Sequence, residues 1–239
     1  MPDLRERATE LRELMDDPRA DLRLLERTYD RFSYVNAVVS RPGLVYRRDV
    51  RPRARRGPIR ILDIGSGGGD LCRSLAAHLR RDGLRAEITA LDPDERAIAW
   101  AEEHDEGAGI HYRAAHSSHL VAEGERFDVV LSNHLLHHLT GEELGALLSD
   151  SEHLVGDGGV AAHHDIARSR TAYAAFAMGT GLLSTTLLAD SFIRVDGLRS
   201  IRRSYTAQEL SAAVPAPWRV RTHLPARLEL RWEAPHARS

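Results

Sequence analysis

Short apolar runs alternate with longer segments of helical character between residues 59 and 166, and this alternation constrains the fold more than any other feature. The apolar runs predict strands at Ile59–Ile64, Ala86–Leu91, Ile110–Ala115, Phe127–Asn133 and Gly159–Ile166. The segments between them predict helices at Asp70–Arg81, Asp94–Glu103 and Glu142–Leu154. Strands joined by helices pair in parallel through right-handed crossovers. We therefore expect an α/β fold whose open sheet is covered on both faces and binds ligands beyond the carboxyl ends of its strands.

The chain before this alternation is predicted to be mostly helical. A helical periodicity predicts a short amphipathic helix that carries Leu4, Ala8, Leu11 and Met15 and ends near Asp17. A second helix is expected at Asp21–Ser40, before the break at Pro42. The arginine-dense segment Arg47–Pro58 is interpreted as a solvated linker.

The chain after the alternation is expected to cover the sheet and then extend it. Ser169–Arg203 is predicted to form helices, and Thr206 has the spacing to Glu209 of a capping box that opens a short helix. Two segments of alternating polarity, Trp218–Leu224 and Arg227–Trp232, predict a terminal antiparallel hairpin. We expect a helical cap and linker at residues 1–57 and a main domain at residues 58–239, with a lid insert at about 169–203.

Composition excludes several kinds of chemistry. All 33 basic residues are arginine, so no lysine can bind a phosphate, form a Schiff base or act as a base. Cys72 is the single cysteine, which excludes disulfides and cysteine zinc sites. The net charge of -2 argues against a nucleic-acid partner, and no apolar run is long enough to span a membrane. The charged N-terminus lacks a signal-peptide pattern, so we expect the cytoplasm.

A glycine-rich turn follows the first predicted strand. Gly65, Gly67 and Gly69 allow a sharp turn and a close approach of the backbone to a ligand. An acid, Asp63, precedes the turn, and Asp92 at the end of the second predicted strand is placed to accept hydrogen bonds from two ribose hydroxyls. The turn lacks the third glycine of a dinucleotide fingerprint, and Asp70 stands where a pyrophosphate would be repelled.

These features resemble motif I of the Rossmann-like, class I S-adenosylmethionine-dependent methyltransferases, and the resemblance extends from about Ile59 to Ile166. It implies a mostly parallel seven-stranded sheet with a terminal antiparallel hairpin, and S-adenosylmethionine as cofactor. It places Asp63 near the methionine end of the cofactor and Asp92 on the ribose. His116 stands where family members often carry an acid for the adenine. The cofactor-binding residues implied are Asp63, Gly65, Ser66, Gly67, Asp92, Pro93, His116, Ser117, Asn133 and His134.

The residues after the fourth predicted strand bear on the methyl acceptor. Asn133–Leu136 lacks the Asn/Asp-Pro-Pro-aromatic tetrad of enzymes that methylate amino groups of bases. Tyr29–Ser40 resembles a segment of ubiquinone and menaquinone methyltransferases, although Phe32 replaces a tyrosine, and His164–Arg168 is similar to methyltransferases of polyketides and phenolic lipids. The resemblance implies O-methylation of a small aromatic acceptor in secondary metabolism. The alternatives are C-methylation of a quinol precursor and a catalytically silent, methyltransferase-like partner protein. The sequence is compatible with an oligomer.

Histidines are the candidate bases, because a phenol with a pKa of roughly 10 must lose its proton and imidazole titrates near neutral pH. Five histidines follow predicted strand ends: His134, His137, His138, His163 and His164. Neighbours on a strand face opposite sides, so one of His163 and His164 is expected to face the cleft. We expect His164 to be the base, with His137 and His138 as alternatives and Asp165 as an orienting or acceptor-binding group. No metal site is predicted.

The predicted lid insert supplies candidate walls for the acceptor. Its large apolar side chains are expected to line a chamber or to form the core of a helical cap: Tyr173, Phe176, Met178, Leu182, Leu183 and Phe192. Arg168 and Arg170 are candidates for clamping an acidic substrate, with surface pairing as the alternative.

Overall fold

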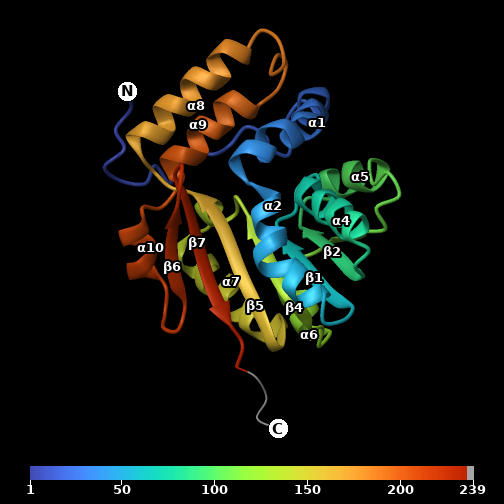
Figure 1. Ribbon diagram of the computed structural model, residues 1–239. Coiled ribbons are helices and arrows are strands. Elements are labelled where there is room, and N and C mark those ends of the chain that lie inside the picture. The colour runs from blue at the N-terminus through green and yellow to red at the C-terminus, as the bar shows by residue number, and fades with distance from the viewer. Residues whose placement is uncertain (236–239) are drawn as a thin grey trace.

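The computed structural model describes residues 1–235, and within them seven strands form one sheet (Figure 1). The strand order is β3-β2-β1-β4-β5-β7-β6, with β7 antiparallel to β5 and β6. The strands are β1 (Ile59–Ile64), β2 (Ala86–Asp92), β3 (His111–Ala114), β4 (Phe127–Asn133), β5 (Val155–Ile166), β6 (Arg219–His223) and β7 (Arg227–Glu233). The expected α/β fold, mostly parallel with an antiparallel terminal hairpin, is confirmed.

Helices cover both faces of the sheet because successive strand residues bury opposite sides. On β1, Ile61 packs against α4 (Asp70–Asp82), whereas Leu62 packs with the residues of α7 (Gly141–Leu154). The same second face carries α6 (Ser117–Ala122) and α10 (Ala207–Ala213), and α5 (Glu95–Glu103) packs near β2 and β3. The capping box expected at Thr206 is present, and a second capping box at Thr140 opens α7.

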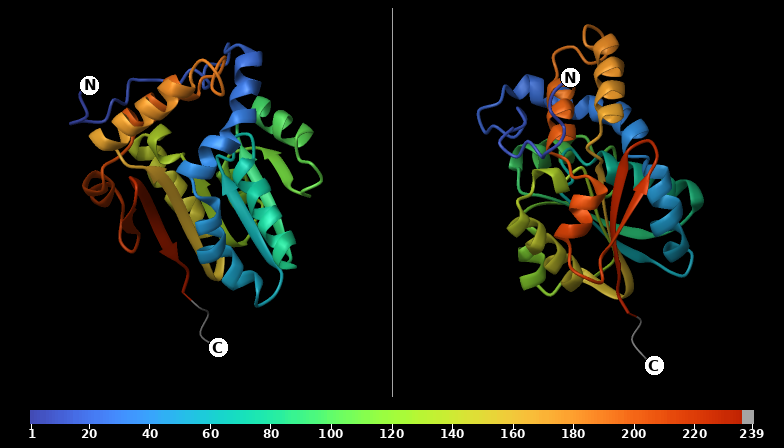
Figure 2. Two further views of the ribbon diagram at one scale, coloured as in Figure 1. Left: turned by 45° about the horizontal axis from the view of Figure 1, so that its top comes forward. Right: turned by 90° about the vertical axis from the view of Figure 1, so that its left-hand side faces the viewer.

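A roof of helices lies over the carboxyl ends of the parallel strands (Figure 2). It consists of α1 (Leu22–Val39) and the pair α8 (Arg170–Leu183) and α9 (Ile193–Arg203), which pack against each other. The insert after β5 is therefore helical, as expected. The division into residues 1–57 and 58–239 stays a prediction. Among residues 1–235, no helix combines the length and the apolar character that crossing a bilayer requires.

The predicted helix over Leu4–Met15 is wrong. Residues 1–20 form turns, bends and irregular segments, and some of their backbone groups bond to the roof. Asp196 on α9 accepts hydrogen bonds from the main-chain N–H groups of Leu14, at 2.7 Å, and Met15, at 3.0 Å. Tertiary partners therefore replace the hydrogen bonds that a helix would supply.

The segment Arg47–Pro58 is not the solvated linker that its arginines suggest. A short helix, α2 (Pro42–Val45), a π-helical turn, η1 (Tyr46–Val50), and α3 (Arg51–Ala54) pack on the sheet through a buried stripe. Asp49 is buried in η1 and accepts a hydrogen bond from Arg231 of β7 at 2.6 Å. Tyr46, Val50 and Ala54 are spaced four residues apart and form the buried stripe, and the arginines lie between them.

Candidate functional site

A cavity of about 400 Å³ lies between the carboxyl ends of the strands and the helical roof. Its lower wall consists of residues at or just after the ends of β1, β2 and β4, and its upper wall consists of α1, α8, α9, the N-terminal segment and the turn at Leu136–His138. Eight of the expected cofactor residues line it: Asp63, Gly65, Ser66, Gly67, Asp92, Pro93, Asn133 and His134. Asn36 and Asp70, which sequence reasoning did not assign, also line it and share a hydrogen bond of 2.9 Å.

The glycine loop, residues 65–69, is held against the end of β2. The N–H groups of Gly65 and Ser66 donate to the carbonyl oxygen of Leu91, at 2.8 and 3.1 Å. Gly65 has φ +71°, and a Cβ there would lie 2.9 Å from Leu135 Cδ1. The Gly67 N–H donates to Asp92 Oδ2 at 2.8 Å. Glycine is therefore required at position 65, and the loop and Asp92 form one rigid unit.

Three buried polar atoms on the cavity wall have no hydrogen-bond partner among the described residues. They are Asp63 Oδ1, Ser66 Oγ and Asn133 Oδ1. Burial raises the pKa of Asp63 to about 8, with Cys72 as a hydrogen-bond donor and Asp70 and Asp92 as neighbouring acids. Because unpartnered buried acceptors cost free energy, this wall fits a ligand that supplies donors and a positive charge. The ammonium and hydroxyl groups of S-adenosylmethionine are such donors.

The remaining expected adenine contacts lie elsewhere. Ser117 donates a hydrogen bond to Asp150 at 2.6 Å and begins α6, and His116 is exposed beside it. Neither residue lines the cavity. The chain after β3 forms α6, a helix that the sequence did not predict, and the Ser117 hydroxyl is bonded to Asp150 there.

The expectation that His163 or His164 faces the cleft is wrong, because neither residue lines the cavity. His163 is fully buried between the hydroxyls of Ser132, at 2.8 Å, and Ser151, at 3.1 Å. His164 is buried on the other face of β5, beside Arg227. Burial lowers the pKa of both histidines to about 3. Both faces of β5 are covered by other parts of the chain. Although the two histidines point to opposite faces, neither side chain therefore reaches the cavity.

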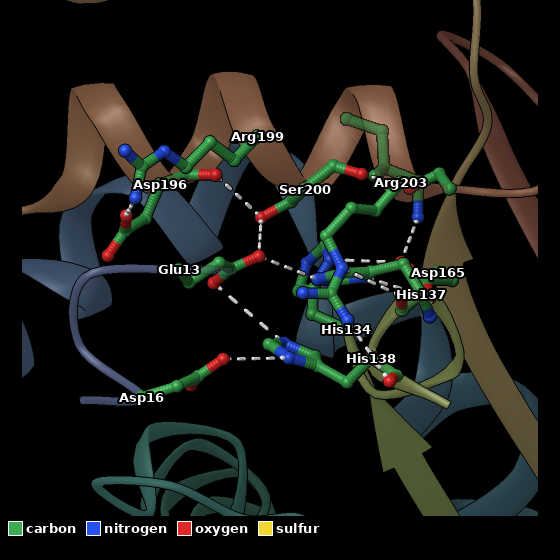
Figure 3. A network of polar contacts seen from close by, with 12 residues as sticks. Glu13, Asp16, His134, His137, His138, Asp165, Asp196, Arg199, Ser200 and Arg203 are labelled. Atoms are coloured by element: carbon green, nitrogen blue, oxygen red, sulfur yellow. Dashed lines mark hydrogen bonds and ion pairs between the residues drawn. The ribbon is translucent and has the colours of Figure 1, made fainter. Parts of the chain in front are cut away.

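A network of acids and histidines occupies the upper wall instead (Figure 3). Asp165 accepts from His137 Nδ1 at 2.9 Å, and His137 Nε2 lies 3.2 Å from Glu13 Oε1. Burial opposes a charge on His137, but the charge of Asp165 and the hydrogen bonds that His137 donates to both acids raise its pKa to about 10. Burial also disfavours a charge on Glu13, but the hydrogen bond from His137 lowers its pKa to about 2. His137 is therefore an imidazolium between two carboxylates at neutral pH.

Two further histidines border the cavity. His138 Nδ1 lies 3.2 Å from Asp16 Oδ2, and its side chain is 27% exposed. His134 Nε2 lies 2.9 Å from the Ser40 hydroxyl, which accepts a hydrogen bond from Asn133. Sequence reasoning assigned no role to Glu13, because its partners come from distant segments and no local pattern marks it.

The roof contributes fewer apolar walls than expected. Phe176 lines the cavity, together with Ile193, Asp196, Gly197 and Ser200 of α9. The other expected side chains do not line it: Tyr173, Met178, Leu182, Leu183 and Phe192. Arg168 is buried and donates to the carbonyl oxygens of Leu4 and Ser204, so it fastens the N-terminal segment instead of clamping a substrate. Arg170 also lies outside the cavity lining.

Comparison with known proteins places these features in a family. A methyltransferase-domain family model matches residues 61–159. The ubiquinone biosynthesis O-methyltransferase of Sinorhizobium medicae is 33% identical over 115 residues, which cover 47% of this chain and 43% of that protein. The enzyme of the same name from Parvibaculum lavamentivorans is 33% identical over 132 residues, 54% of this chain and 48% of that protein. The chain thus matches less than half of the length of these curated relatives.

Solved structures share the fold at low sequence identity. An O-methyltransferase family protein from Burkholderia thailandensis superposes with a TM-score of 0.60 at 16% identity, over 94% of this chain and 62% of that chain. The plantazolicin methyltransferase BpumL, in complex with SAH, superposes with a TM-score of 0.56 at 15% identity, over 93% of each chain. The domain match over residues 61–159, the similarity to the O-methyltransferase relatives and the sheet order together support a class I S-adenosylmethionine-dependent methyltransferase.

Proposed function

We propose that the chain methylates the hydroxyl oxygen of a small aromatic acceptor, such as a phenolic polyketide or lipid, in the cytoplasm. The observation that carries the proposal is the cavity beyond the strand ends, whose lower wall fits the cofactor and whose upper wall combines aromatic side chains with an acid–histidine network. The relatives named as ubiquinone biosynthesis O-methyltransferases support an oxygen acceptor on an aromatic ring.

S-adenosylmethionine supplies a methyl group on a sulfonium centre, which an acceptor oxygen attacks in line. The chain must therefore hold donor and acceptor in one orientation and exclude water. We assign the donor to the lower wall, with Asp63 and Asn133 at its methionine end and Asp92 at its ribose. Tyr29 and Phe32 of α1 and Phe176 of α8 contribute aromatic side chains to the upper wall, and we assign the acceptor ring to Phe32 and Phe176.

The acceptor hydroxyl is assigned to the part of the upper wall that holds His137 and His138. His137 already carries a proton at neutral pH and cannot take another. His164 lies outside the cavity, so its assignment as the base is withdrawn. His138 is the remaining candidate among the expected bases, because it borders the cavity and is partly exposed.

Two measurements test the proposal. Calorimetric titration with S-adenosylhomocysteine is expected to show one binding site per chain. Incubation with S-adenosylmethionine and a panel of mono- and dihydric phenols is then expected to yield O-methylated products, identified by mass spectrometry and NMR. Absence of S-adenosylhomocysteine binding would refute the enzymatic role, and products methylated only on ring carbon would favour the C-methylation alternative.

A further inference from the structure

Two histidines and one glutamate converge at the upper wall of the cavity (Figure 3). One ligand atom from each of Glu13, His137 and His138 lies within 4.8 Å of the others. His137 Nε2 lies 3.2 Å from Glu13 Oε1, and His138 Nε2 lies 3.8 Å from Glu13 Oε2. We call Glu13, His137 and His138 the His–Glu cluster. Both imidazoles thus direct their Nε2 atoms toward the same carboxylate.

The outward nitrogen of each histidine meets a second carboxylate. His137 Nδ1 bonds to Asp165 Oδ1 at 2.9 Å, and His138 Nδ1 lies 3.2 Å from Asp16 Oδ2. The Ser200 hydroxyl donates to Glu13 Oε1 at 2.6 Å. Histidines that bind metals have this arrangement, in which a carboxylate fixes the ring through Nδ1 and leaves Nε2 for the ion.

We propose that the His–Glu cluster binds one divalent cation of the Zn²⁺ class, through the Nε2 atoms of both histidines and the Glu13 carboxylate. Two imidazoles and one carboxylate are the ligand set of open zinc sites, which leave a coordination position for water or substrate. Without the cation, the His137–Glu13 ion pair occupies this place.

The local backbone explains why two neighbouring histidines can share one ion. The sequence predicted no metal site, because neighbouring histidines on a strand, such as His163 and His164, face opposite sides. His137 and His138 lie in a 3₁₀ turn, η2 (Leu136–His138), where their ring centroids are 4.3 Å apart. The third ligand comes from the N-terminal segment, which Arg203 of α9 holds to the same turn through the carbonyl oxygens of Leu11 and His137.

The position of the cluster suggests what the cation does. This step rests on the proposed function. All three cluster residues line the cavity assigned to the acceptor, so the open coordination position faces that space. A hydroxyl bound to a divalent cation loses its proton to solvent at a lower pH than a free one, which prepares the oxygen for methylation. His138 is then a ligand of the ion and not a free base.

Cobalt titration of the full chain tests the site. The protein is stripped with a chelator, dialysed and titrated with Co²⁺, and binding is followed by visible absorption and calorimetry. We expect one Co²⁺ per chain, at least tenfold weaker binding by both Glu13→Gln and His138→Ala, and about 10- to 100-fold weaker binding by Asp16→Asn. His153→Ala is the matched control, because His153 is an exposed histidine on α7 that bonds to the Ser149 carbonyl of its own helix.

S-adenosylhomocysteine binding by the same samples separates the two proposals. A wild-type chain that binds S-adenosylhomocysteine but not Co²⁺ overturns the metal site and leaves the methyltransferase proposal intact. A wild-type chain that binds Co²⁺ but not S-adenosylhomocysteine overturns the methyltransferase proposal and leaves the metal site intact. Equal Co²⁺ affinity in the wild type, Glu13→Gln and His138→Ala places the ion elsewhere and overturns the site. A variant that retains S-adenosylhomocysteine binding is folded, so its loss of Co²⁺ reports on the ligand that was removed.

Discussion

The carboxylate of Asp165 holds His137 by two groups at once, the main-chain N–H at 2.8 Å and the ring Nδ1 at 2.9 Å. Burial alone would raise the pKa of Asp165, but the charge of His137 holds it well below its usual range. The pair joins the end of β5 to the turn after β4. Both side chains are 2% exposed, so water cannot replace either partner.

Asp165→Asn is expected to lower the free energy of unfolding by about 3 kcal/mol, because it leaves a buried imidazolium with one charged partner instead of two. Urea unfolding at pH 7 measures the loss. Asp16→Asn is the control, since Asp16 pairs with a histidine but is 44% exposed and should cost below about 1 kcal/mol. Equal stability of the two variants would contradict the role of Asp165.

The folded protein should begin to lose stability at pH values well above those at which its carboxylates titrate. The pKa of His163 and of His164 is about 3 in the folded chain, whereas an unfolded histidine titrates near 6.5. Between these values the unfolded chain binds more protons, so stability falls as the pH falls, by up to about 1.4 kcal/mol per pH unit for each histidine. His137 acts in the opposite sense, since its raised pKa removes stability only as the pH rises above 6.5 toward about 10.

His164→Gln isolates one of these contributions, because His164 Nε2 has no hydrogen-bond partner within residues 1–235. Urea unfolding between pH 7 and pH 4.5 should show a shallower loss of stability for the variant than for the wild type. The same slope in both proteins would show that His164 is not neutral in the folded chain.

The sequence predicted the residues of the lower cavity wall better than those of the upper wall, for a physical reason. The glycine loop and Asp92 are set by local backbone requirements at strand ends, which the sequence displays. Glu13, Asp196 and Ser200 meet only through tertiary packing between the N-terminal segment and α9. Apolar residues recur at helical spacing in residues 4–15, but this segment is irregular in the structure, so the spacing alone did not predict it correctly. Alternation along β5 correctly placed His163 and His164 on opposite faces of the strand, but it could not show that both faces are covered.

Cofactor affinity should rise with pH up to about 8, the pKa of Asp63 in the ligand-free chain. A ligand ammonium beside Asp63 favours its ionised form, so binding below this pH releases the carboxyl proton. The affinity for S-adenosylhomocysteine is expected to rise by up to about tenfold per pH unit, measured by calorimetry between pH 6 and pH 7.5. In Asp63→Asn the pH dependence should vanish. A pH-independent affinity in the wild type would place the ammonium elsewhere.

Asp92→Ala should weaken S-adenosylhomocysteine binding by about 3 kcal/mol, roughly a hundredfold in Kd, because it removes a charged acceptor and an anchor of the glycine loop. The anchor is the 2.8 Å hydrogen bond from the Gly67 N–H. Asp92→Asn keeps an oxygen acceptor and is expected to bind with intermediate affinity. A wild-type Kd in Asp92→Ala would remove the ribose assignment.

Gly197→Ala should damage acceptor use while sparing the cofactor. Gly197 lies on α9 against the Phe176 ring, and a Cβ there would stand 2.3 Å from Phe176 Cζ, so the ring must move within the cavity. We expect kcat/KM for the acceptor to fall at least tenfold, with the Kd of S-adenosylhomocysteine unchanged within about twofold. Gly145→Ala is the matched control, because Gly145 lies on α7 with no atom within 4 Å of the added Cβ, and it should raise stability by about 0.5–1 kcal/mol. Normal acceptor kinetics in Gly197→Ala would show that the Phe176 ring does not border the bound acceptor.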